Sequence, residues 1–154
     1  MKKPLFALIA SIALASTAFA QTTVTQPWVR ATVPQQTASG AFMQLRSADS
    51  AKLVSATSPI AASVQIHKME MTGQTMKMRE VDAIDLPAGE TVNLASGGFH
   101  IMLVGLKRQL KEGETVPLSL VIERKNGKRE TVAIDAPVKP LTYSAPQGAA
   151  QMHH

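Results

Sequence analysis

The period of the hydrophobic pattern most constrains the fold of this chain, because that period is two residues instead of 3.6. Apolar and polar residues alternate in eight or nine short runs, and Gly, Pro, Asn or Asp separates most of them. The expected strands are 22–32, 38–47, 52–57, 63–71, 75–81, 91–94, 99–104, 115–123 and 128–134. This pattern predicts an all-β domain, an antiparallel β-sandwich or barrel.

Local signals add detail to this prediction. Pro27 marks the first strand as an edge or bulged strand, because proline has no N–H to donate to a ladder. Residues 106–111 suggest a single helical turn, closed by Gly113.

A signal for a β-hairpin lies in the C-terminal third of the chain. Asn126-Gly127 predicts a two-residue type I′ turn. In that register the flanking like charges face each other, in the pairs Lys125–Lys128 and Arg124–Arg129. We expect a solvated hairpin tip, and a basic dock for an acidic partner is the alternative.

The first twenty residues have the form of a secretory signal peptide. Two lysines precede an apolar run over 4–17, and an A-x-A cleavage signal follows at 18–20. The run is too short for a permanent membrane span. We therefore expect the mature chain to begin at Gln21, in the periplasm of a Gram-negative cell. No cysteine follows the cleavage signal, so we expect no membrane anchor there.

The remaining chain is expected to hold one β-domain over 21–135 and a flexible C-terminal tail over 136–154. Pro137, Pro140 and Pro146 are expected to interrupt regular structure in this tail. We expect the protein to be a monomer.

Composition removes several classes of function. The chain has no cysteine, which excludes disulfides, thiolate zinc sites, iron–sulfur clusters, blue-copper centres and cysteine nucleophiles. Without residues 1–20 it carries 14 basic and 11 acidic residues, a net charge of +3. No basic patch is interleaved with aromatic residues, so we expect no nucleic-acid partner. Neither paired carboxylates nor a Ser/His/Asp set is visible, so we expect no enzymatic activity.

The residues with distinctive chemistry are the histidines and methionines. Eight methionines occur, four of them between Met69 and Met78, and the two internal histidines lie among methionines. Strand alternation places His67 on the same face as Met69, and His100 on the same face as Met102.

The turn between the first two Met-rich runs sets their expected register. Gly73 suits the first central position of a type II′ turn. That turn would place Met71 opposite Met76, and Met69 opposite Met78, with His67 diagonal to Met78.

Two imidazoles and two thioethers form a soft, neutral donor set. Such a set favours Cu(I) over Zn(II), Mg(II) or Ca(II). A thioether also avoids the disulfide formation that threatens a thiol in an oxidising compartment. Because the thiolate of a blue-copper carrier is missing, the donor set favours copper binding and carriage over redox catalysis.

Methionine is more often a core residue than a metal ligand, and we expect this of Met43. For Met71 and Met76, near the turn, a surface position and an auxiliary copper contact remain equally open, and Met69 is likewise undecided. Both internal histidines share a strand face with methionine, which favours the metal interpretation for four residues: His67, Met78, His100 and Met102.

The spacing of these four residues matches a known signature. Ten residues separate His67 from Met78, twenty-one separate Met78 from His100, and one separates His100 from Met102. With the segments L-P-A-G-E and G-G-F-H-I-M-L-V-G-L, the chain resembles the periplasmic copper chaperones of the PCuAC family over about residues 28–134.

This resemblance implies a cupredoxin-like fold that holds one Cu(I) per chain in an exposed site. It also implies delivery of copper to the copper-binding subunit of cytochrome c oxidase, directly or with a Sco-type protein. The chain departs from the family at Ser96, where a proline is common. Relatives with a long Met/His-rich tail bind Cu(II) through it. Here the tail offers Met152, His153 and His154, and whether they bind copper is open.

Two other functions remain open from the sequence. One is a periplasmic copper storage or resistance protein without a dedicated acceptor, and the other is a β-sandwich of assembly or adhesion type that binds no metal. Copper-dependent growth of a deletion strain, set against its oxidase activity, separates storage from delivery. Metal analysis of the purified protein separates the last alternative.

Overall fold

The computed structural model describes residues 21–145, and over this range the regular elements are strands. They are β1 (Thr22–Arg30), β2 (Ala38–Ser47), β3 (Ala51–Thr57), β4 (Ala61–Thr72), β5 (Thr75–Glu80), β6 (Ile84–Leu86), β7 (Thr91–Leu94), β8 (Phe99–Leu106), β9 (Thr115–Arg124) and β10 (Arg129–Lys139). The all-β prediction is confirmed. Within these residues no helix is long and apolar enough to cross a membrane.

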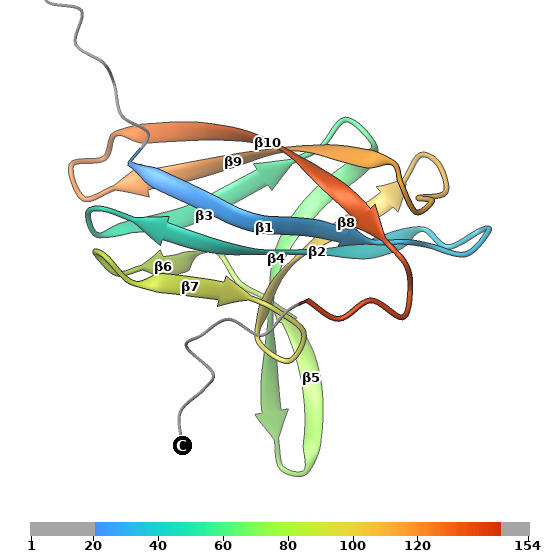
Figure 1. Ribbon diagram of the computed structural model, residues 1–154. Helices are drawn as coiled ribbons and strands as arrows, with labels where there is room; N and C mark the ends of the chain where they lie inside the picture. The colour runs from blue at the N-terminus through green and yellow to red at the C-terminus, as the bar shows by residue number, and fades with distance from the viewer. Residues whose placement is uncertain (1–20, 146–154) are drawn as a thin grey trace, which may run out of the picture.

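Hydrogen bonds join the strands into one sheet that folds over into two layers (Figure 1). The strand order is β5-β4-β8-β2-β1-β10-β9-β3-β6, and β7 pairs with β2 beside this path. The layers meet where β1 and β10 pair in parallel, with Val29 opposite Val138. The sheet is therefore mixed, whereas the sequence predicted antiparallel pairing throughout.

The core lies between the two layers. Ile101 and Leu103 of β8 are buried there, which leaves the alternate residues His100 and Met102 on the outer face of their layer. Met43 is 2% exposed and belongs to this core, as predicted. Every second residue of β9 is also buried, again as predicted: Val116, Leu118, Leu120 and Ile122.

The first strand is bulged, as Pro27 predicted, but it is not an edge strand. Its register against β2 shifts between Thr25 and Trp28, and Gln26 has a positive φ of 50°. Because the bulge takes proline out of the regular ladder, β1 can lie between β2 and β10 in the middle of the sheet.

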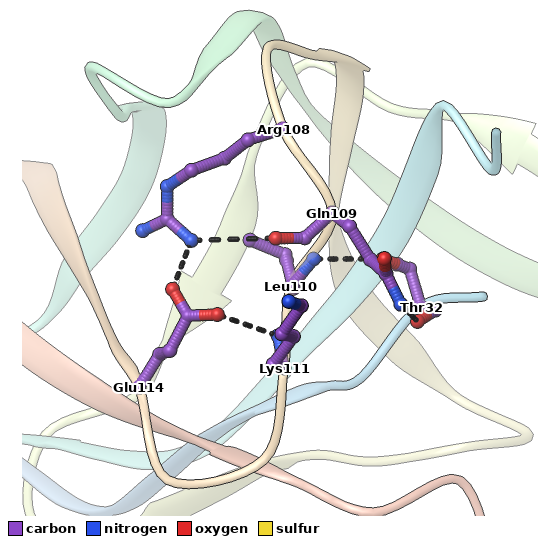
Figure 2. Close-up of polar contacts among 6 residues, drawn as sticks. All are labelled: Thr32, Arg108, Gln109, Leu110, Lys111 and Glu114. Carbon is purple, nitrogen blue, oxygen red and sulfur yellow. Dashed lines mark hydrogen bonds and ion pairs between the residues drawn. The ribbon is translucent and has the colours of Figure 1, made fainter. Parts of the chain in front are cut away.

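The predicted helical turn at 106–111 was wrong. Leu110 is fully buried, and its N–H donates to the Thr32 hydroxyl at 2.8 Å. The Glu114 carboxylate accepts from the Lys111 N–H at 3.0 Å and pairs with Arg108 (Figure 2). These contacts hold the segment as an irregular loop, because they take the backbone groups that a helical turn would use.

The predicted register of the hairpin between β9 and β10 was also wrong. The loop has three residues, 125–127, and the Arg124 N–H donates to the Lys128 carbonyl across it. Gly127 takes a positive φ of 80° there. This one-residue shift places Arg129 opposite Glu123, with which it forms an ion pair, and Arg124 opposite Lys128, while the Arg124 side chain pairs with Glu130.

The strand β10 continues beyond the expected domain boundary at residue 135. Ala136 and Val138 are buried in the core, so the prediction that the prolines interrupt regular structure from residue 136 was wrong as far as Lys139. Pro137 fits because its partner is Thr115 of β9, and pairing with β1 begins only at Val138. The predicted signal peptide at 1–20, and Met152, His153 and His154, lie outside the described residues.

Candidate metal centre

The hairpin of β4 and β5 carries the first half of the candidate site. Gly73 has a positive φ of 65° in a two-residue turn, and the register pairs Met69 with Met78 and Met71 with Met76, as predicted. Alternation places these methionines on the same face as His67. The hairpin extends away from the two-layer body (Figure 1).

The strand β8 brings the second histidine beside the first. His67 and His100 are direct cross-strand partners, and their ring centroids lie 5.6 Å apart. The Nε2 atom of His100 lies 3.1 Å from Sδ of Met78. Three of the four predicted ligands, on three neighbouring strands, are therefore in one place.

Met102, the fourth predicted ligand, lines a shallow groove on the outer face of the sheet. It lies two residues after His100 on the same face of β8, and both line the groove together with Met69. Met102 is opposite Gln65 of β4 on one side and Gly40 of β2 on the other. Met102 thus lies beside His100 in the groove, whereas His67 and Met78 are next to His100 but do not line it.

The candidate site is buried at His100 and open at Met78. His100 is 6% exposed, whereas Met78 is 51% exposed. The expected exposed site is therefore most open on its β5 side, with His67 and Met102 partly exposed. Burial lowers the pKa of His100 below its usual 6.5, and the neighbouring His67 lowers it further, against an opposing contribution from the backbone of Gly98. A neutral His100 retains the lone pair that a metal ion needs.

The imidazole nitrogens have unequal surroundings. His67 Nε2 lies 2.8 Å from Gln65 Oε1. With that amide oxygen as acceptor, Nε2 is assigned the proton and Nδ1 is left with a lone pair. The Nδ1 atoms of His67 and His100 are both buried, and neither has a hydrogen-bond partner among residues 21–145. A buried polar atom left without a partner is costly, and an ion bound at His67 Nδ1 is one way to satisfy that atom.

The contact between His100 and Met78 suits two ligands of one metal ion. With metal–nitrogen bonds of about 2.0 Å and metal–sulfur bonds of about 2.3 Å, tetrahedral ligand atoms lie about 3.5 Å apart. The observed nitrogen–sulfur distance of 3.1 Å is close to that separation. The residues present therefore fit a soft metal ion bound between imidazole and thioether.

Sequence reasoning missed three residues around the site. Gln65 holds the His67 ring, and alternation with His67 was the signal that could have shown it. The Phe42 ring lies 6.1 Å from the His100 ring and stacks on Trp28 at 4.6 Å. Gly40 leaves room for Phe42, since a Cβ there would lie 2.8 Å from the end of that ring. No local signal linked β2 to β8.

Comparison with known proteins assigns this chain to a family. The sequence profile described as "Putative lipoprotein LpqE-like" matches residues 22–138. The chain belongs to the LpqE-like family. A related protein, "Putative lipoprotein Lxx21020" from Leifsonia xyli subsp. xyli, is 35% identical over 120 residues, which are 77% of this chain and 70% of that protein.

Solved structures place this LpqE-like chain in the PCuAC fold. The copper-bound PCuAC domain from PmoF2 has a TM-score of 0.63 and 29% identity, over 80% of this chain and 96% of that domain. The solution structure of Cu(I)-DR1885 from Deinococcus radiodurans has a TM-score of 0.55 and 34% identity, over 84% of this chain and 85% of that one. The cupredoxin-like fold and the resemblance to the PCuAC family are confirmed.

Proposed function

We propose that this protein binds one Cu(I) ion in the periplasm through His67, Met78, His100 and Met102, and carries it to an acceptor. The observation that carries the proposal is the 3.1 Å contact between His100 Nε2 and Met78 Sδ, with His67 directly across the strand. Two related structures add support, since one is named as copper-bound and the other as a Cu(I) form.

The chemistry of the donors sets the metal and the role. Imidazole and thioether are neutral, so they offer a hard or borderline dication no anionic ligand. We therefore expect one tight Cu(I) per chain and much weaker zinc binding. We propose binding and carriage instead of catalysis, because these donors hold the ion without activating a water molecule.

The proposed acceptor is the copper-binding subunit of cytochrome c oxidase, reached directly or through a Sco-type protein. A neutral donor set leaves the full positive charge of Cu(I) uncompensated. Cysteine thiolates of such an acceptor are softer and cancel that charge, so the equilibrium favours transfer. The exposed side of Met78 gives the acceptor access to the ion.

The proposed compartment follows from the predicted signal peptide. The Leifsonia relative is named as a lipoprotein, whereas this chain contains no cysteine. We propose that the protein is free in the periplasm and acts as a monomer. Cell fractionation and size-exclusion chromatography of the secreted protein test both statements, and recovery with the membranes would contradict the first.

Anaerobic Cu(I) titration with a competing chelator tests binding, and a transfer experiment tests delivery. We expect one tight equivalent, lost in the His67→Ala/His100→Ala variant. Cu(I)-loaded protein is then mixed with a reduced, copper-free oxidase copper domain while NMR follows His67 and His100. Copper that stays on this protein at equimolar acceptor would contradict delivery and favour storage. Equal retention of Zn(II) and Cu(I) would contradict the proposed site.

A further inference from the structure

The β4–β5 hairpin carries more sulfur than the proposed Cu(I) site uses. Met69 faces Met78, and one step toward the turn Met71 faces Met76. Directly opposed residues have Cβ atoms about 4.5–5.5 Å apart, and diagonal neighbours lie within reach of long side chains. The four thioethers therefore form a continuous row from the groove to the hairpin tip.

The outer pair of this row is exposed in an unusual way. Met71 is 63% exposed and Met76 is 45% exposed, and neither packs on the core cluster. Two large apolar side chains side by side on an edge hairpin gain little from burial there. The stability of the fold therefore does not explain why both positions hold methionine.

Four charged residues of the hairpin lie on its opposite face, whereas Glu80 is on the methionine face, opposite His67 at the end far from the turn. Lys68, Glu70, Lys77 and Arg79 occupy the alternate positions, and Arg79 pairs with Glu70 at 3.2 Å. Around the turn end, the methionine face therefore offers thioether sulfur without a competing carboxylate or ammonium group. Neutral sulfur donors select soft monovalent cations and need no deprotonation before binding.

We infer that Met71 and Met76 form a second, weaker binding site for a soft monovalent cation, Cu(I) or Ag(I), with Met69 as the third sulfur. This inference rests on the proposed function, because the second site would bind copper on the same face of the hairpin, nearer its tip than the first site. The second site lacks an imidazole, so it binds more weakly than the first. Met69 links the two sites, since it pairs with Met78 and lines the groove of His100.

Ag(I) titration of the secreted protein with ¹³C-methyl-labelled methionine tests this inference, because Ag(I) resembles Cu(I) and is not oxidised. The first equivalent should shift the methyl signals of Met78 and Met102. The second should shift those of Met71 and Met76, with an affinity at least about tenfold lower, a difference of about 1.4 kcal/mol. Zn(II) should move neither of the outer signals.

Variants separate the two sites. The Met71→Leu/Met76→Leu variant keeps the side-chain volumes and should lose the second equivalent while it retains the first. The control Met43→Leu alters a buried methionine and should retain both. In the His67→Ala/His100→Ala variant the outer methyl signals should still shift, so failure of the proposed Cu(I) site is distinguishable from failure of this one. Outer signals that stay unmoved at excess Ag(I), or a second equivalent that survives the Leu variant, would overturn the inference and leave the exposed pair as a protein contact.

Discussion

The Nε2 atom of His100 lies 3.1 Å from the sulfur of Met78, although 22 positions separate the two residues in the chain. The contact exists because β4 lies between β5 and β8, so that both neighbours present their side chains on the same face of β4. It joins a buried nitrogen to an exposed sulfur. This combination suits a site that holds a metal ion and also releases it.

The first prediction concerns the methionine of this contact. Met78→Leu should weaken Cu(I) binding by at least about tenfold, because even residues that only orient a ligand contribute that much. The free energy of unfolding should change little, since Met78 is half exposed. Chelator competition and urea unfolding measure the two quantities. Met43→Leu is the matched control, and an equal loss of affinity there would place the site elsewhere.

The second prediction concerns Gln65, which we assign as a positioning residue. Gln65→Ala should weaken Cu(I) binding by about tenfold, less than His67→Ala, because the His67 ring loses its partner but keeps its lone pair. ¹⁵N NMR of the apo protein should show the His67 ring in mixed tautomers in this variant. An unchanged tautomer together with unchanged affinity would contradict the assigned role.

The third prediction is a pH dependence of stability in the metal-free protein. Burial holds the pKa of His100 below the value of 6.5 that it has in the unfolded chain. The unfolded state therefore binds more protons in the window just below pH 6.5, so stability falls as the pH falls through that window. Thermal unfolding between pH 7.5 and pH 5, an interval of about one unit or more on each side of 6.5, measures this. His100→Gln should flatten the slope, and an unchanged slope would contradict the prediction.

The fourth prediction is a pH dependence of Cu(I) affinity that follows imidazole protonation. Thioether sulfur carries no proton, so only imidazole protonation competes with Cu(I). Affinity should be nearly constant above about pH 7 and should fall below about pH 6. Chelator competition at several pH values measures this, and a steep loss between about pH 8 and 9 would indicate a ligand outside the proposed set.

The fifth prediction concerns the packing of β8 against β4. Gly105 has a positive φ of 68°, and a Cβ there would lie 2.7 Å from the Cβ of Ala62. Gly105→Ala should destabilise the fold by about 3 kcal/mol, from backbone strain and overpacking together. Gly89→Ala is the control, because φ is 73° but the space is open, so about 1 kcal/mol is expected. Equal losses in urea unfolding would contradict the packing argument.

The part of the candidate site that lies on the β4–β5 hairpin was predictable from the sequence. Gly73 fixed the turn, and the turn fixed which methionines of β4 and β5 face each other. The same reasoning failed at Gly127, because Asn-Gly fits both a two-residue and a three-residue loop. There the ion pair of Arg124 with Glu130 accompanies the longer loop, and that choice depends on cross-strand charges which the turn residues do not encode.

Strand alternation in the sequence alone determined that the protein is all-β, and donor chemistry predicted that His67, Met78, His100 and Met102 form one soft donor set. The tertiary structure decided that His67 lies directly opposite His100, that His100 is buried beside Phe42, and that Met78 stays exposed. The reason is physical. Alternation along a strand fixes the face of each side chain, whereas the choice of neighbouring strand and its register depends on how the whole sheet closes over its core.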